Sequence, residues 1–146
     1  MAREFIEKDR QTYIDFAKEF YSGGGVLHQV PVECFNKTFD AIIAKNPFVQ
    51  GYMLECDGVP AGYCVTAKGF ATEIGGNTLW VEDIFVKPEF QGKGIAKTFL
   101  KELIESTDSS VCRIRLEATK DNSNAIGLYN KLGFEELKYN QYILDK

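Results

Sequence analysis

Residues 84–97 read IFVKPEFQGKGIAK and join three kinds of local sequence. The apolar run from Ile84 to Val86 is typical of a strand, Pro88 interrupts it, and the residues after Gly94 open an amphipathic helix. Glycines at such a turn let a ligand approach the main chain closely. The first amides of a helix lack partners within it and lie in the positive potential of its dipole. The turn therefore predicts a site for a phosphate or pyrophosphate.

Two familiar phosphate-binding loops do not match this turn. A Walker A loop needs Gly-x-x-x-x-Gly-Lys-Ser/Thr, which the chain does not contain. A dinucleotide fingerprint needs Gly-x-Gly-x-x-Gly, and Lys97 occupies the place of its last glycine. The turn instead resembles the acetyl-coenzyme A loop of the GNAT superfamily of N-acetyltransferases, Gln/Arg-x-x-Gly-x-Gly/Ala. Gln91, Gly94 and Ala96 stand on its fixed positions.

A second motif, NSNAIGLYNKLGF, occupies residues 122–134. Asp121, Asn122 or Ser123 can cap a short helix there, and Gly133 supplies a left-handed stop. Four apolar residues share a face at helical spacing: Ala125, Leu128, Tyr129 and Leu132. The segment resembles the C-terminal GNAT motif, Asn-x-x-Ala-x-x-Leu-Tyr-x-Lys-x-Gly-Phe. With both motifs in this order, the resemblance covers roughly residues 78–144.

Composition limits the classes of function. The chain has 146 residues, 45% of them hydrophobic, which predicts one domain over residues 1–146. Its net charge of -4 argues against a nucleic-acid-binding protein and favours cationic partners. No apolar run reaches the ~18 residues of a membrane span, and the start has no signal-peptide pattern. We therefore expect a cytoplasmic protein.

The cysteines and the single histidine do not indicate a metal site. Cys34, Cys56, Cys64 and Cys112 show no Cys-x-x-Cys spacing, and His28 is the chain's only histidine. We expect reduced, mostly buried thiols and no bound metal.

The spacing of apolar and turn residues predicts a mixed α/β order, β-α-α-β-β-β-α-β-α-β. Residues 68–77 fit either a short strand or a loop. The other elements are expected as a strand at 3–7, a helix capped by Asp9 and ending near 21, a helix at 32–45, strands at 51–56 and 59–67 joined by an Asp57-Gly58 turn, a strand at 79–86, a helix at 92–106, a strand at 111–118, a short helix ending at 131, and a strand at 134–144.

The resemblance implies a GNAT-like fold for this order of elements. Such a fold is a largely antiparallel sheet of about six to seven strands, flanked by about four helices. It also implies that the strands bearing the two motifs run parallel and splay apart, so that the cofactor lies in the cleft between them.

Acetyl transfer from a thioester to an amine requires a base, an oxyanion donor and an acid for the departing thiolate. Glu82 is the candidate base. Strict alternation along the strand puts it on one face with Trp80, Ile84 and Val86, and puts Asp83 on the opposite face. A carboxylate on an apolar face has a raised pKa, as a base near neutral pH requires.

The strand also resembles that of diamine N-acetyltransferases, where Glu-Asp precedes an aromatic-Val pair and the phosphate loop at the same spacing. In those enzymes the glutamate is proposed to act, often through water. The alternative role for Glu82 is a carboxylate at the cleft rim, solvated or paired with a lysine or arginine.

Tyr129 is the candidate acid, because a phenol is protonated at neutral pH and can donate to a thiolate. The resemblance places the tyrosine of this Leu-Tyr pair near the thioester sulfur. Its alternative role is an aromatic anchor between the helix and the sheet.

The resemblance also implies the contacts with acetyl-CoA. The oxyanion donor is expected from the backbone of Phe85 or Val86, with a register uncertainty of one residue. Asn122 matches the family asparagine that contacts the cofactor, and capping of the helix explains it equally well. The full set of cofactor-binding candidates is Ile84, Phe85, Val86, Gln91, Gly92, Lys93, Gly94, Ile95, Ala96, Lys97 and Asn122.

Selection of the acceptor is expected from the N-terminal half. Phe20, Tyr21, His28 and Phe35 are candidates for lining its pocket, and His28 is an alternative base. The leading prediction is an acetyl-CoA-dependent N-acetyltransferase that acts by direct transfer on a small primary amine, polyamine-like or aminoglycoside-like. The alternatives are a protein N-terminal or lysine acetyltransferase, and a non-catalytic acyl-CoA-binding sensor. The superfamily is often dimeric, so the resemblance makes a homodimer one option, but no feature of the sequence fixes the oligomeric state.

Overall fold

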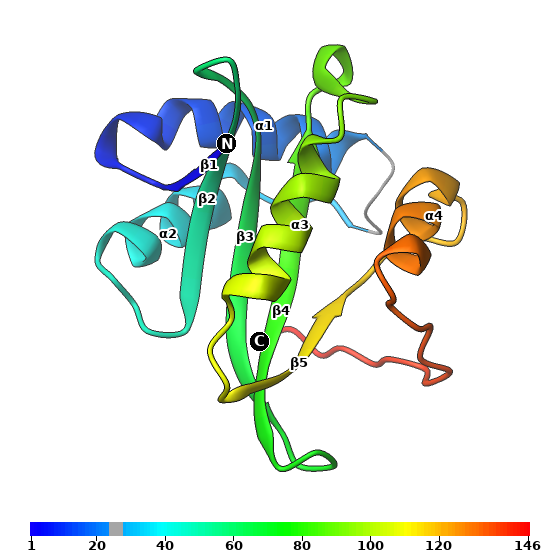
Figure 1. Cartoon of the computed structure of the whole chain (residues 1–146). Coiled ribbons are helices and arrows are strands. Elements are labelled where there is room, and N and C mark those ends of the chain that lie inside the picture. The colour runs from blue at the N-terminus through cyan, green and yellow to red at the C-terminus, as the bar shows by residue number, and fades with distance from the viewer. Residues whose placement is uncertain (24–27) are drawn as a thin grey trace.

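The computed structural model describes residues 1–23 and 28–146 (Figure 1). Within these residues a mixed sheet has the strand order β1-β2-β3-β4-β5. Neighbouring strands are antiparallel, except that β4 and β5 run parallel. The strands are β1 (Ala2–Glu4), β2 (Val49–Cys56), β3 (Val59–Ala71), β4 (Gly76–Val86) and β5 (Val111–Leu116).

Helices cover both faces of this sheet. On one face, α1 (Arg10–Ser22) and α2 (Val32–Ile43) pack over β2 and β3. On the other, α3 (Ile95–Ser106) crosses the sheet in front of β4, with α4 (Ser123–Lys131) beside it (Figure 1). Two short 3-10 helices, Glu7–Asp9 and Pro88–Phe90, lead into α1 and toward α3.

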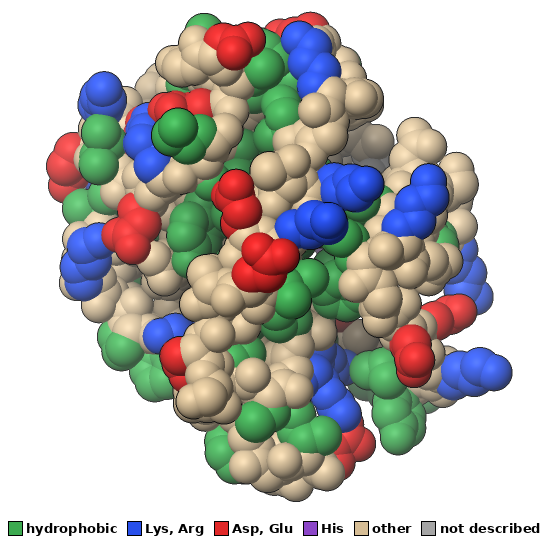
Figure 2. Space-filling view, in the orientation of Figure 1, with side chains coloured by type: hydrophobic (Ala, Val, Ile, Leu, Met, Phe, Trp, Pro, Cys, Tyr) green, Lys and Arg blue, Asp and Glu red, His purple; other side chains and the backbone are tan. Residues whose placement is uncertain are grey.

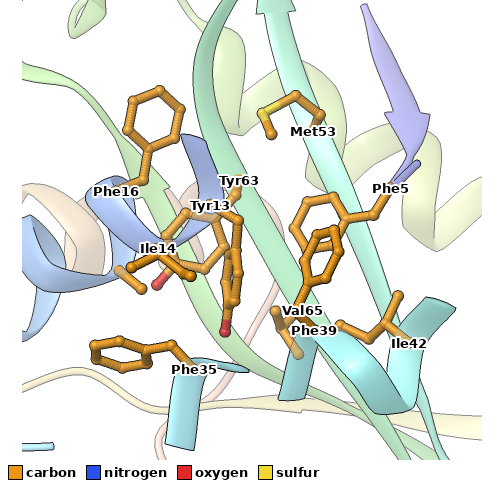
Figure 3. Close-up of a cluster of buried hydrophobic side chains, with 11 residues drawn as sticks. Phe5, Tyr13, Ile14, Phe16, Phe35, Phe39, Ile42, Met53, Tyr63 and Val65 are labelled. Atoms are coloured by element: carbon orange, nitrogen blue, oxygen red, sulfur yellow. The ribbon is translucent and has the colours of Figure 1, made fainter. Parts of the chain in front are cut away.

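Each face has its own apolar core. The α1–α2 side is aromatic: Phe5, Tyr13, Phe39 and Tyr63 are at most 3% exposed and pack against one another (Figure 3). The edge of the Tyr13 ring meets the Tyr63 ring with centroids 5.1 Å apart. The α3 side is a separate cluster that includes Leu79 and Val81 of β4. Because β4 contributes to both cores, the face that each of its residues takes decides which environment that residue meets.

Several local predictions are confirmed. Asp57 and Gly58 have φ of 52° and 77°, and positive angles at both residues are the backbone that a type I′ hairpin turn requires. The uncertain residues 68–77 extend the two flanking strands on either side of a short turn. Asp9 stands at the expected N-cap position of α1, but its side chain makes no capping hydrogen bond. Its carboxylate instead accepts the Ile6 amide at 2.9 Å and pairs with Arg3 at 2.6 Å, since these partners precede the helix.

The predicted last strand, 134–144, is wrong, and over residues 1–23 and 28–146 the sheet has five strands and not six or seven. Asn140 and Gln141 interrupt the apolar alternation of this segment, so neither face has the continuous apolar row that specifies a register. The Tyr139 and Tyr142 side chains are correspondingly 72% and 90% exposed.

Gly62 lies where β3 and β4 approach most closely. A Cβ atom built at this position would stand 2.0 Å from the Phe85 carbonyl oxygen, which is main chain held in the sheet. We expect Gly62→Ala to lower the free energy of unfolding by about 3 kcal/mol, the upper part of the usual range for an overpacked site. Urea denaturation of the purified protein measures this change.

Gly127, inside α4, provides the control, because a Cβ there meets no atom within 4 Å. Gly127→Ala should raise the unfolding free energy by about 0.5–1 kcal/mol through helix propensity. Equal stabilities of the two variants would contradict the close approach at Gly62.

Candidate active site

The site lies where β4 and β5 part. The parallel ladder between them runs from Asn77–Val111 to Val81–Leu116, and β4 then continues alone on that side to Val86. At the same point the β3–β4 register shifts, so that Thr66 pairs with Val81 and Val65 with Asp83. This shift leaves Glu82 as an extra residue in a β-bulge. The bulge and the loss of the β5 partner together open the edge of β4.

The direction of the backbone groups beyond the bulge follows from one hydrogen bond. The Lys87 amide donates to the Ala61 carbonyl at 2.9 Å. Because these groups alternate along an antiparallel strand, the backbone N–H and C=O of Phe85 point toward β3, and those of Ile84 and Val86 point toward the open side. Consistently, the Gln91 side chain donates to the Val86 carbonyl at 3.0 Å. Of the two expected oxyanion donors, Val86 thus presents its amide to the gap, whereas the Phe85 amide faces the ladder.

The turn after β4 is a row of backbone donors. Gly92 and Gly94 have φ of 76° and 79°, and neither position has an atom within 4 Å of an added Cβ. Gly94 is the N-cap of α3, whose first backbone bond runs from the Thr98 amide to the Gly94 carbonyl. Throughout 1–23 and 28–146, no acceptor bonds the amides of residues 92–97. The turn therefore has the free amides and the open space that a pyrophosphate needs.

Positive charge borders this turn. Lys97 is exposed on the first turn of α3, and Lys93 Nζ lies 5.0 Å from the Phe90 ring centre. Figure 2 shows Lys and Arg side chains gathered over the first half of α3 and over the neighbouring α4. These side chains add electrostatic attraction for an anion to the helix dipole.

The second motif lies beside the opened strand. Asn122 caps α4, since its Oδ1 accepts the Ala125 amide at 3.2 Å. Tyr129 is 8% exposed and packs against Phe134, with ring centres 6.0 Å apart. Burial raises the pKa of the Tyr129 phenol, so it stays protonated at neutral pH. No hydrogen bond joins its hydroxyl to another residue in the part of the chain that the structure describes. Tyr129 thus combines both expected features, an anchored ring and an available donor.

Of the two adjacent carboxylates of β4, Asp83 lies on the face opposite Ile84 and Val86 as alternation predicted, whereas the apolar face around Glu82 does not follow strict alternation. Ile84 and Val86 pack into the α3-side core together with Val81. Residues 81 and 84 therefore lie on the same face of the sheet although they are three positions apart, because the bulge adds one residue between them. Glu82, the extra residue of the bulge, is exposed and is not part of that apolar core. Its pKa is nevertheless raised, first by partial desolvation and then by the Asp83 and Glu117 carboxylates.

Asp83 is the buried carboxylate, and sequence analysis missed its importance. It is 6% exposed and accepts hydrogen bonds from the Tyr21 hydroxyl at 2.6 Å and the Tyr63 hydroxyl at 3.1 Å. Desolvation raises its pKa, and the two phenols partly offset that rise. The one signal in the sequence was a pair of adjacent carboxylates in an otherwise apolar strand, which breaks the alternation.

Three of the four predicted acceptor residues gather beside Asp83. Tyr21 bonds to it, the Phe20 ring stands edge-on to Tyr21 at 4.9 Å, and Phe35 lies 5.4 Å from Tyr21. His28 is exposed, and within the described ranges no hydrogen bond or ion pair links it to these residues.

The cysteines and the search for metal ligands give two plain results. All four thiols are free, but Cys34 and Cys112 are exposed, so the expected burial holds only for Cys64 and in part for Cys56. In the portion of the chain with described coordinates, no three His, Cys, Asp or Glu side chains come close enough to hold a metal ion.

Among the described helices, none is long and apolar enough to cross a membrane.

Comparison with known proteins identifies the family. The model of the acetyltransferase (GNAT) family matches residues 11–134 of the chain. The chain belongs to the GNAT family. The match includes both motifs of the site.

Relatives of this GNAT protein carry the names of amine acetyltransferases. It is 33% identical over 102 residues to thialysine N-epsilon-acetyltransferase of Sus scrofa, covering 64% of this chain and 59% of the relative. It is 37% identical over 67 residues to spermine/spermidine N(1)-acetyltransferase of Bacillus subtilis strain 168, covering 42% and 44%. In each of these two matches the chain spans less than two thirds of the relative's length.

The fold is shared over the whole chain. A crystal structure described as a possible acetyltransferase from Clostridium difficile 630 superposes with a TM-score of 0.80 at 20% identity. The superposition covers 100% of this chain and 97% of that one.

Proposed function

We propose that this GNAT protein is an acetyl-CoA-dependent N-acetyltransferase that acts directly on a primary amine of a small molecule. The observation that supports this proposal is the continuity between two features of one segment. The open edge of β4 beyond Glu82 leads without interruption into the free amides of residues 92–97. A thioester on the edge and a pyrophosphate on the turn would lie along a single path.

Acetyl-CoA would supply the activated thioester, and this chain would hold it at three places. The amides from Gly92 to Lys97 would receive the pyrophosphate, helped by the charge of Lys93. The outward backbone groups of Ile84 and Val86 would bind the pantetheine arm. The Val86 amide would also donate to the developing oxyanion. Asn122 would support this arrangement chiefly by capping α4.

Two side chains would move the protons. Glu82 takes one proton from the acceptor ammonium, directly or through water, because only the free amine is nucleophilic. The nitrogen–carbon bond forms as the carbon–sulfur bond breaks, and the Tyr129 hydroxyl gives its proton to the departing thiolate. The second proton, which the nitrogen loses as it becomes an amide, returns through solvent to the Tyr129 phenolate. The raised pKa values of Glu82 and Tyr129 suit these roles, since the first favours proton uptake and the second keeps the phenol protonated.

The acceptor is proposed to be a small cation. Two carboxylates, Glu82 and Glu117, lie near each other at the gap, and the Trp80 ring on β4 already holds the Arg115 guanidinium at 4.1 Å. Carboxylates with aromatic faces suit an alkylammonium. The names of the thialysine and spermine/spermidine relatives point to the same class. The protein acceptor and the non-catalytic sensor remain the alternatives.

The direct test is acetyl transfer to a panel of polyamines, aminoglycosides, amino acids and short peptides, read as mass gain of the acceptor. Mass detection avoids interference from the four free thiols. We expect a polyamine or diamine to be the best acceptor. Peptide acetylation alone would favour the protein acceptor, and coenzyme A binding without any transfer would favour the sensor.

Tyr129→Phe tests the acid directly. The ring that packs on Phe134 is kept and only the hydroxyl is lost, so the fold should change little. We expect turnover to fall about tenfold or more, the low end of acid–base contributions. Steady-state kinetics with the best acceptor measure it, and a wild-type rate would leave Tyr129 with the anchoring role alone.

The other expectations stay predictions. They are a single acetyltransferase domain over residues 1–146, a homodimer, and a cytoplasmic location. Four free thiols are what a reducing compartment would leave.

A further inference from the structure

Asp83 is a buried charge that the proposed reaction does not use. Its carboxylate accepts hydrogen bonds from Tyr21 and Tyr63, and no Lys, Arg or His of the described chain forms an ion pair with it. A buried carboxylate without a countercharge is costly unless hydrogen bonds compensate it. The two phenols provide that compensation and thereby tie Asp83 to two other elements.

These bonds meet at the bulge. Asp83 pairs with Val65 of β3 directly after the extra residue Glu82, so it marks the point where regular pairing resumes. Tyr63 belongs to β3 and fixes β4 to that strand, while Tyr21 lies near the end of α1. A bulge is otherwise a local weakness of the ladder, because its extra residue is unpaired. Tyr21 from α1 and Tyr63 from β3 both bond to Asp83, the residue next to the bulge.

We infer that Asp83 is a positioning residue: clamped by Tyr21 and Tyr63, it locks the β4 bulge and so aims Glu82 into the gap between β4 and β5. The catalytic part of this inference rests on the proposed function, in which Glu82 is the base. Tyr21 also packs on Phe20 and Phe35, which are predicted to line the acceptor pocket. The clamp therefore connects that pocket to Glu82.

The clamp has an electrostatic consequence for Glu82. Asp83 and Glu117 are the charged groups that face Glu82, and both raise its pKa. The titratable groups around Asp83 are Tyr13 and Tyr21 of α1, Tyr63 and Cys64 of β3, and Glu82. Replacing the Asp83 carboxylate by an amide removes a like charge, so the Glu82 titration should move to lower pH.

The test compares Tyr21→Phe and Asp83→Asn with Tyr13→Phe. Tyr13 is a buried phenol on the same helix as Tyr21 and has no hydrogen bond to Asp83. Tyr13→Phe therefore controls for the loss of a buried hydroxyl as such. The Glu82 carboxyl is followed by NMR titration of carbon-13-labelled protein, with its signal assigned by Glu82→Gln. We expect Asp83→Asn to move the Glu82 midpoint to lower pH, because the neighbouring like charge is gone.

Tyr21→Phe tests the positioning. Loss of its bond should shift the backbone amide signals of residues 82–84 and lower kcat at least about fivefold, as a misplaced catalytic group does. The dissociation constant for coenzyme A should stay within about twofold, because the phosphate turn is untouched. Tyr13→Phe should change neither the Glu82 midpoint nor kcat.

The inference is overturned if Tyr21→Phe and Asp83→Asn behave like Tyr13→Phe in the Glu82 midpoint, amide signals and kcat. Tyr63→Phe removes the other phenol and replaces Tyr21→Phe if that variant does not fold. The NMR readouts need no turnover. If Glu82→Gln keeps full activity, the assigned base is wrong, while the midpoint and amide shifts still decide whether the clamp holds the bulge.

Discussion

Gly94→Glu should abolish binding of coenzyme A. The position is the N-cap of α3 with φ of 79°, next to the free amides of the turn, and an added Cβ meets no atom within 4 Å. A glutamate there fills that space and places a negative charge where a pyrophosphate would bind. We expect affinity for coenzyme A to fall by about a hundredfold or more, which corresponds to about 2.7 kcal/mol. Isothermal titration calorimetry with coenzyme A measures it.

The positive φ itself imposes a cost on any side chain at Gly94, so the control must share it. Gly75, in the turn between β3 and β4, has φ of 62° and likewise no atom within 4 Å of an added Cβ. Like Gly94→Glu, Gly75→Glu should lower the free energy of unfolding by roughly 1–2 kcal/mol. It should keep the wild-type affinity for coenzyme A. Unchanged affinity in Gly94→Glu would remove the phosphate site from this turn.

Glu82→Gln should remove the acidic limb of the pH–rate profile along with most of the activity. The glutamate must be deprotonated to accept a proton, so kcat/KM of the wild type rises as pH increases through its raised pKa. The amide keeps the size of the side chain and cannot accept that proton. We expect turnover to fall by about a hundredfold or more, with coenzyme A affinity unchanged.

Glu89→Gln is the matched control, since it neutralises an exposed carboxylate of the same segment that pairs with Lys87. It should keep both the rate and the acidic limb. If the limb persists in Glu82→Gln, another group is the base, and His28 is the first to substitute. If binding is intact in Glu82→Gln and the wild type transfers no acetyl group to any acceptor, the sensor replaces the enzyme.

Sequence analysis succeeded where the chemistry is local. The Asp57-Gly58 turn, the Asn122 cap and the left-handed Gly133 each depend on a few consecutive residues, and all three are found. The strand, turn and helix of residues 84–97 also follow one another as expected, although α3 begins at Ile95 and not at 92. Helix ends depend on the last turn of backbone bonding, which residue types specify only to within a residue or two.

Sequence analysis failed where pairing with a neighbouring strand decides which face of the sheet a side chain takes. The alternation rule assumes an unbroken ladder, and pairing with β3 inserts Glu82 as an extra residue. That single residue brings Val81, in place of Trp80, onto the face of Ile84 and Val86 and leaves Glu82 exposed, while Asp83 keeps the opposite face and is buried there. The last strand failed for a related reason, because residues 134–144 meet no partner edge.

The sequence by itself determined the backbone of the turn after β4, because Gly92 and Gly94 favour left-handed backbone without help from distant residues. It also determined the family, through two motifs whose spacing lies within the chain. Only the tertiary structure decided where the carboxylates of β4 point, since that depends on the β3 register and on two phenols 62 and 20 residues away from Asp83. Such contacts are set by packing between elements, which no local pattern encodes.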